Sequence, residues 1–227
     1  MACGAYGASV AAAGVGTLIG AGSGGGAFGA VWAAPRAAKS SPLAIAVFMG
    51  GTSILSDMAD EPWLRGPIAG VHPLIAPVLF ALQQAREDLA KYTDGLTTEQ
   101  IWATPHGFGS AGFHIRHIAG STDRLMTYAQ GQELTEEQFA ELRAEERVAG
   151  AEREELLSML DEAFARAEAV LRTVDPARLA EPRVVGRQKL PTTLIGLLVH
   201  VAEHTQRHVG QAISACKWAQ KGAVGSV

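Results

Sequence analysis

Apolar residues recur at every third or fourth position along four stretches of the chain, which is the spacing of one face of an α-helix. The first stretch runs from about Pro73 to Gly95, and the second from about Ser110 to Gln130. The third covers about Ala151 to Thr173, and the fourth follows Pro191. These patterns predict four long amphipathic helices that bury their apolar faces against one another.

Two capping-box patterns predict shorter helices between the long ones. Thr97-Thr98-Glu99-Gln100 begins one that continues through Trp102, and Thr135-Glu136-Glu137-Gln138 begins a charged, peripheral one that ends near Arg147. Residues 181–190 contain proline and glycine and are interpreted as a loop or a short extended turn over the mouth of a site. The predicted fold class is therefore all-α, a four-helix bundle with one or two short extra helices.

Residues 1–57 differ in composition from the rest of the chain. Alanine and glycine dominate them, and no charged residue precedes Arg36. A secretory signal needs basic residues at its start, which this segment lacks. We favour the interpretation that translation starts at Met58 and that 1–57 is a low-complexity stretch upstream of it; a disordered or exported leader is the alternative. Residues 58–227 are predicted to form one helical domain.

Charge and cysteine content narrow the class of protein further. A formal net charge of −4 provides no basic surface for nucleic acid or for an anionic membrane. The apolar run 42–54 is short for a membrane span, and no membrane segment is predicted within 58–227. Cys3 and Cys216 share no metal-type spacing and indicate a reducing compartment, so we expect a cytoplasmic protein.

Histidines are spaced as helix neighbours in the last predicted helix. His200, His204 and His208 stand four residues apart and therefore share one helix face. An i, i+4 histidine pair can hold one metal ion, and His117, one turn after His114 on the second predicted helix, can reach it across the core. Three imidazoles leave a coordination position open, as in catalytic metal sites. The alternative is that these histidines are partly buried polar residues bonded to neighbouring helices.

Four polar residues near these histidines have two interpretations each. Glu203 is either a general base or the partner of Arg207 in an i, i+4 ion pair. Arg207 can instead bind a substrate carboxylate. Tyr128 either reaches the pocket or packs in the core. Gln211, on the histidine side of its helix, either caps a buried polar group or contacts substrate.

The remaining basic candidates lie further from the histidine spacing. Arg124 is near the face of His117 and either meets a substrate anion or forms an interhelical ion pair. Arg183, Arg187 and Lys189 either hold an anionic thiol near the mouth or belong to a solvated loop. His106 falls in a predicted loop and is expected to face solvent.

From Met58 to about Lys221 the chain resembles the DinB-like superfamily of DinB/YfiT-type metal-dependent enzymes. The resemblance rests on residues 112–121, Gly-Phe-His-Ile-Arg-His-Ile-Ala-Gly-Ser, and on residues 200–211, which end in His-x3-His-x-Gly-Gln. It implies a four-helix up-down-down-up bundle. It also implies that His117, His204 and His208 are the ligands of a divalent metal ion. His114 and His200 would then lie behind these ligands or line the pocket.

Many relatives carry an acid just behind the first ligand, where this chain has Gly120 and Ser121, so the resemblance supplies no such support for His117. Similar proteins include transferases that attach low-molecular-weight thiols to electrophiles and a thiol-dependent isomerase. The resemblance therefore implies a thiol S-transferase or related hydrolase for a small-molecule substrate. Zn, Ni, Fe or Mn would suit three histidines. The alternative function is a non-catalytic metal-binding bundle, a sensor or interaction protein, and a homodimer is compatible with the apolar helix faces.

Overall fold

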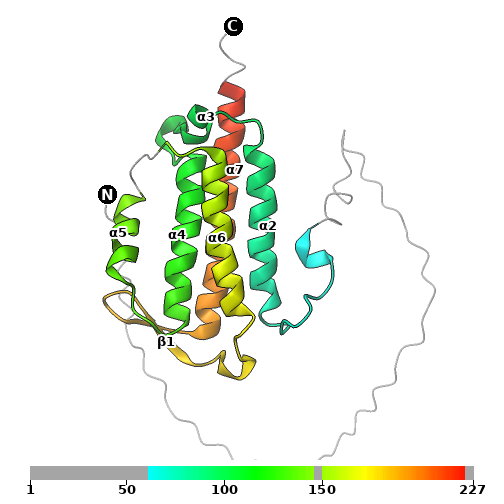
Figure 1. Cartoon of the computed structure of the whole chain (residues 1–227), viewed down its shortest axis with the longest axis vertical. Helices are drawn as coiled ribbons and strands as arrows, with labels where there is room; N and C mark the ends of the chain where they lie inside the picture. The colour runs from blue at the N-terminus through cyan, green and yellow to red at the C-terminus, as the bar shows by residue number, and fades with distance from the viewer. Residues whose placement is uncertain (1–60, 146–149, 223–227) are drawn as a thin grey trace, which may run out of the picture. The chain divides into compact units, whose positions relative to one another are not determined.

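Four long helices dominate the computed structural model, which describes residues 61–145 and 150–222 (Figure 1). The predicted leader 1–57 and the predicted start at Met58 lie outside these residues. The long helices are α2 (Ala76–Thr93), α4 (Ala111–Ala129), α6 (Arg153–Leu171) and α7 (Leu194–Gly222). They coincide with the four predicted amphipathic stretches, so the all-α bundle prediction is confirmed.

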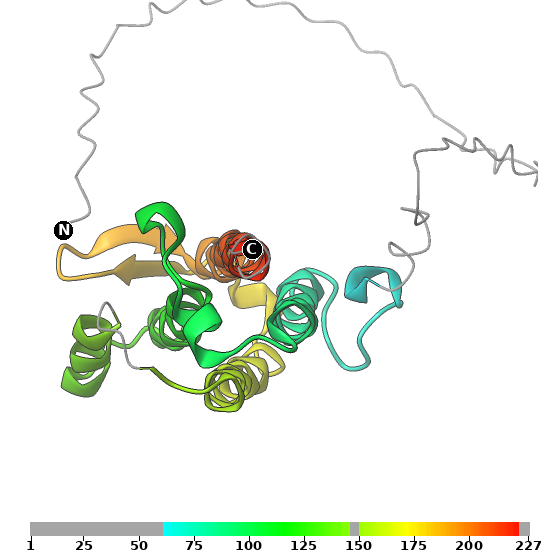
Figure 2. The ribbon, with the colours of Figure 1, turned by 90° about the horizontal axis from the view of Figure 1, so that it is seen from above.

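The direction of the helices explains the position of the shorter elements. Figure 1 shows the chain rising in α2 and α7 and descending in both α4 and α6. Because α4 and α6 run the same way, the chain between them must return along the bundle. The short helix α5 (Glu136–Ala144) belongs to this crossover, and Figure 2, which looks along the long helices, shows it outside the core beside α4.

Side-chain caps fix where several helices begin. Thr97 and Thr135 each form a complete capping box, before α3 (Thr98–Trp102) and before α5, as predicted. The Ser110 hydroxyl accepts a hydrogen bond from the Phe113 backbone N–H at the start of α4. Gly131 follows α4 with a φ of 79°, a conformation that glycine adopts without strain. The beginning of α4 and its end are thus both set by local sequence.

The core lies between the four long helices. Large side chains with at most 1% exposure come from each of them: Leu82 and Leu89 of α2, Ile115 and Ile118 of α4, Leu156, Leu160, Phe164 and Leu171 of α6, and Leu198 and Val201 of α7. Burial of such side chains is the main stabilising contribution to a bundle of this kind. No helix in the two described ranges combines the length and apolar character needed to cross a bilayer.

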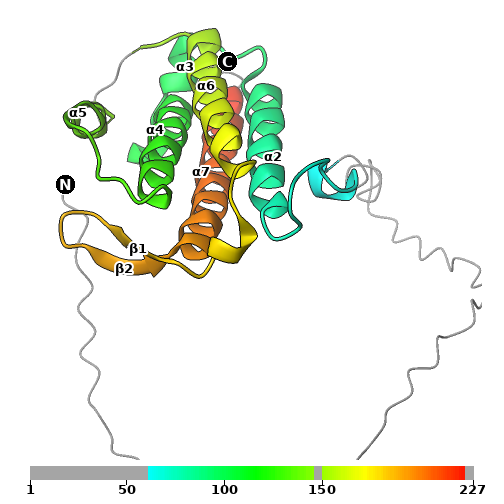
Figure 3. The same cartoon turned by 60° about the horizontal axis from the view of Figure 1, so that its bottom comes forward.

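Residues 181–190, predicted as a loop or short turn, form most of a β-hairpin instead. Strand β1 (Pro182–Val185) pairs antiparallel with β2 (Leu190–Thr193), and Val185 lies opposite Leu190. Prolines are tolerated because both strands of a two-stranded sheet are edges. Figure 3 shows the hairpin at the end of the bundle where α7 begins.

Candidate metal centre

Helices α4 and α7 pack against each other and bring the three predicted ligands together. The ring centroid of His117 lies 5.1 Å from that of His204 and 4.4 Å from that of His208. The rings of His204 and His208 are 4.6 Å apart. One nitrogen from each ring can be chosen so that all three lie within 4.8 Å of one another. The geometry is that of a candidate metal centre.

The hydrogen-bond partners of the rings show which nitrogens are directed at the centre. His117 Nδ1 lies 2.8 Å from Glu145 Oε2, so its N–H donates to that carboxylate and Nε2 keeps the lone pair. This Nε2 is 3.0 Å from His204 Nε2. His208 Nδ1 is 3.0 Å from His114 Nδ1, which leaves Nε2 of His208 for a ligand role.

Burial keeps most of these imidazoles neutral. Burial, followed by repulsion from the protonated form of His117, lowers the pKa of His204 to about 4 and that of His208 to about 3. The same two causes lower the pKa of His114 to about 4. A metal ligand must be deprotonated, so His204 and His208 are ready to bind at neutral pH.

The donor set fits a divalent ion. Metal–nitrogen bonds of about 2.0–2.1 Å place the nitrogens of a tetrahedral site roughly 3.3 Å apart. The observed 3.0 Å between the two Nε2 atoms of His117 and His204 is close to that separation. Three imidazoles also leave a coordination position for substrate or water.

Glu145, at the C-terminal end of α5, is a site residue that the sequence analysis missed. Its other oxygen, Oε1, lies 2.6 Å from Arg124 Nη1, so the interhelical ion pair considered for Arg124 is formed. Burial raises the pKa of Glu145, but the hydrogen bonds and charges of His117 and Arg124 outweigh it, and the net pKa is lowered. The available signals were an acid at the end of a capped helix and a glycine, Gly120, one turn after His117.

Glu203 and Arg207, predicted as catalytic residues, are paired with each other. Arg207 Nη2 lies 2.5 Å from Glu203 Oε2, and the other Glu203 oxygen is 2.6 Å from Nδ1 of His200. The side chains of Glu203 and Arg207 are 40% and 58% exposed. The i, i+4 ion pair between Glu203 and Arg207 is therefore formed. His200 contacts the ring of His204 at 5.3 Å between centroids and Glu203 on its other side.

A cavity of about 560 Å³ adjoins the histidine cluster through His114. Arg207 and Gln211 belong to its wall, as does His106, whose ring meets Trp218 edge-on at 5.0 Å. His106 is exposed, as expected for a loop residue, but it also lines this space. The complete lining is His106, Phe108, Gly109, His114, Arg207, Gly210, Gln211, Ser214, Ala215 and Trp218. We call this space the histidine cavity.

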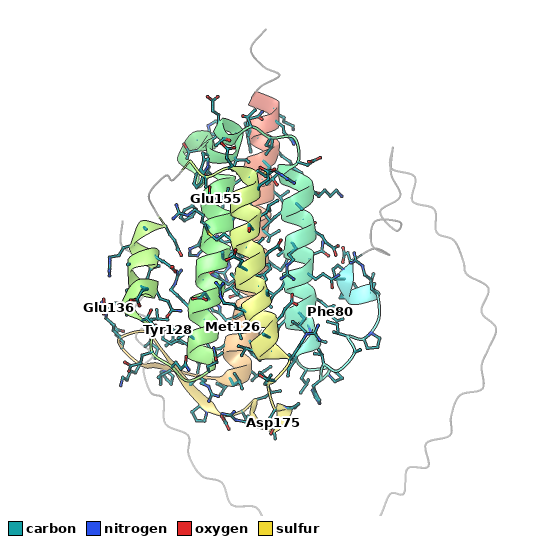
Figure 4. All side chains as sticks on the ribbon, viewed as in Figure 1. Phe80, Met126, Tyr128, Glu136, Glu155 and Asp175 are labelled. Atoms are coloured by element: carbon teal, nitrogen blue, oxygen red, sulfur yellow. The ribbon has the colours of Figure 1, made fainter. Side chains whose placement is uncertain are left out.

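Tyr128, which was expected either to reach the pocket or to pack in the core, lines a different cavity. This hairpin cavity, also about 560 Å³, is bounded by Arg183, Arg187 and Lys189 as well, and none of the clustered histidines lines it. Tyr128 is about 16 Å further along α4 than His117, at 1.5 Å per residue. Figure 4 shows Tyr128 near Glu136, at the hairpin end of the bundle. The structure thus separates Tyr128 and the basic hairpin from the candidate metal centre.

Comparisons with known proteins agree with this architecture. No curated protein sequence matches the chain. A solved structure of YfiT from Bacillus subtilis is similar, with a TM-score of 0.50 and 17% identity over 69% of this chain and 93% of that chain. YfiT is described as a probable metal-dependent hydrolase with an unusual four-helix bundle topology, and at this identity the likeness shows the fold. A model of the DinB superfamily matches residues 81–212, which is more than half of the chain and includes every residue of the histidine cluster. This chain therefore belongs to the DinB superfamily.

Proposed function

We propose that the chain is a metal-dependent enzyme that acts on a small electrophile, either as a thiol S-transferase or as a related hydrolase. One observation carries the proposal: His117, His204 and His208 converge within 4.8 Å, and His208 contacts a wall residue of the histidine cavity. The description of the similar structure, YfiT, as a probable metal-dependent hydrolase supports the hydrolase version.

The three histidines would hold the ion, which is Zn, Ni, Fe or Mn. When bound, the ion supplies Lewis acidity that lowers the pKa of a bound thiol or water. The proposal includes two cofactors, the divalent metal ion and a low-molecular-weight thiol.

The cavity wall supplies the groups that would bind and orient the reactants. Arg207 can pair with a carboxylate of the thiol or the electrophile, and Gln211 can donate a hydrogen bond beside it. Trp218 and Phe108 offer aromatic surface for an apolar portion. Glu203, which does not line the cavity itself, holds the Arg207 guanidinium and is the proposed proton acceptor. The cavity therefore suits a small molecule that has both an anionic and an apolar part.

Metal content of the untagged protein tests the site. We expect close to one equivalent of divalent metal in the parent, and little in the His204→Ala/His208→Ala double variant. His72→Ala, which removes an exposed histidine outside the cluster, is the matched control and should keep the metal. A parent that binds no metal after reconstitution with Zn²⁺ or Co²⁺ would contradict the proposal.

The response of a cobalt-loaded protein to thiol separates an enzyme from a non-catalytic metal-binding module. Addition of 2-mercaptoethanol should change the visible spectrum and add a thiolate charge-transfer band, because an open position accepts the sulfur. An unchanged spectrum would favour the sensor or interaction module.

A cytoplasmic location and a homodimer also belong to this proposal, and cell fractionation and sedimentation would test them.

A further inference from the structure

We infer that Glu145 is a positioning residue for the metal ligand His117, delivered to it by the crossover between α4 and α6. The inference rests on the proposed function, since it takes His117 to be a ligand. Neither Gly120 nor Ser121, which follow His117 on its own helix, can supply an acid. The structure supplies one from a different element.

The two oxygens of Glu145 have different partners. Oε2 accepts the Nδ1–H of His117 at 2.8 Å, and Oε1 accepts from Arg124 Nη1 at 2.6 Å. The side chains of Glu145 and Arg124 are only 7% and 9% exposed, so little water competes for these bonds. Because Arg124 holds one oxygen, the other is fixed on the imidazole. That bond sets the ring orientation of His117 and leaves Nε2 free to face His204.

Gly120 makes the space for this arrangement. A Cβ at this position would overlap Glu145 Oε1 and would lie 2.8 Å from Arg124 Nη1. Glycine inside a helix is unfavourable relative to alanine, so its presence in the middle of α4 needs a reason. We attribute the glycine to the Glu145 carboxylate and the Arg124 guanidinium, which occupy the space that a side chain at position 120 would fill.

The crossover has the length required to bring Glu145 to His117. The capping box at Thr135 starts α5 near the lower end of α4, and its nine residues rise about 13 Å at 1.5 Å each. Figure 1 shows α5 ascending alongside α4, opposite in direction to it. The residue after this rise, Glu145, caps the C-terminal end of α5 and arrives beside the first half of α4, where His117 and Gly120 lie.

Zinc affinity of single variants tests the inference. Competition with a chromophoric chelator at pH 7.5 should show that Glu145→Gln weakens Zn²⁺ binding about 10- to 100-fold, the usual cost of losing such a partner. Glu141→Gln removes an exposed acid one turn earlier on the same helix and should stay within about twofold of the parent. Circular dichroism of the metal-free variants checks that each is folded.

A second pair of variants tests the space at Gly120. Gly120→Ala should also weaken Zn²⁺ binding, because the new methyl group displaces the Glu145 carboxylate. Combined with Glu145→Ala, the same substitution should cost no further zinc affinity, because the carboxylate is already gone and Arg124, which the methyl group would also approach, then holds no group that contacts His117. Additive losses in the double variant would contradict the proposed coupling.

Glu145 could act only as the partner of Arg124, without orienting His117. The position of the proton on the His117 ring distinguishes these two roles. Long-range ¹H–¹⁵N correlation of the metal-free parent should show a proton fixed on Nδ1 of His117, and Glu145→Ala should lose this signature. An unchanged signature, or a folded Glu145→Gln variant that binds Zn²⁺ as tightly as the parent, would overturn this inference alone. A parent without zinc affinity would overturn the metal site and this inference together.

Discussion

Two cavities of the bundle, the histidine cavity and the hairpin cavity, have the same volume, about 560 Å³, and different surroundings. The histidine cavity lies toward the end of α7 and touches the cluster through His114. The hairpin cavity lies at the opposite end, among the basic residues of β1 and the turn that follows it, and none of the clustered histidines lines it. Cavity volume and positive charge alone therefore do not identify the candidate metal centre. What distinguishes the histidine cavity is that its wall residue His114 contacts the convergent histidines, of which His204 has a pKa lowered to about 4 and His208 a pKa lowered to about 3.

The largest expected difference between the two cavities is in how variants of their residues change the stabilisation of the fold by zinc. Zinc at 100 times its dissociation constant should stabilise the parent by about 2.7 kcal/mol, because it binds the folded state. His208→Ala should remove this gain, while Tyr128→Phe, in the hairpin cavity, should keep it. Urea unfolding with and without Zn²⁺ measures both. Equal stabilisation of His208→Ala and the parent would break the comparison.

At the hairpin end we expect an effect on stability that is independent of metal. Arg183 donates to the Ala129 carbonyl at 2.7 Å and to Glu181 at 3.1 Å, and it is largely buried, so it ties β1 to the end of α4. Arg183→Met should cost about 1–3 kcal/mol of unfolding free energy and leave Zn²⁺ affinity unchanged. Arg187→Met, which among the described residues loses a cation–π contact with Phe139, is the control and should cost less than about 1 kcal/mol. A loss of zinc affinity in Arg183→Met would connect the two ends.

The contrast also shows which parts of the molecule the sequence could predict. Helix faces and caps depend on neighbours within four residues, so the four long helices and the capping boxes at Thr97 and Thr135 were predictable. The pairing of His204 with His208 follows from the same local rule. The choice of His117 as their partner required a resemblance, because periodicity does not say which helices face each other.

Features that depend on the path of the crossover were not predictable. Glu145 belongs to a helix that we expected to be peripheral, and it lies 28 residues from His117, a contact that no local rule gives. The sequence left open whether Tyr128 reaches the pocket or packs in the core, because sharing a helix face with His117 does not place two residues at the same height along the helix. The hairpin was missed because proline and glycine in 182–191 also indicate a loop.

A smaller difference is expected in the binding of aromatic ligands. Trp218 is 55% exposed and lines the histidine cavity. Trp218→Ala should weaken the binding of benzyl mercaptan to the cobalt-loaded protein about fivefold, close to 1 kcal/mol for one aromatic contact. Binding of 2-mercaptoethanol, which has no ring, should be unchanged. Phe139→Ala, in the hairpin cavity, should affect neither thiol; an equal effect of both substitutions would remove the distinction between the cavities.

The smallest expected signal concerns the protein's own thiol. Cys216 is fully buried, and burial raises its pKa to about 11, so only about one thiol in a thousand is ionised at pH 8. In a Cys3→Ser background, iodoacetamide should leave Cys216 almost unmodified in the folded protein and should modify it readily in urea. Mass spectrometry measures both states. Rapid native modification would mean that a protein thiol, and not only a ligand, is available near the histidine cavity.

The ligands of the candidate centre come from distant parts of the chain, and this affects when the centre can form. His117 and His204 are 87 residues apart, and the helix that carries His204 and His208 is the last of the four to be synthesised. Closing so long a loop costs entropy that only the docked helix repays. We therefore expect metal capture by the proposed site to be a late event in folding. A zinc-sensitive probe added during refolding would respond to the completed bundle and not to its early helices.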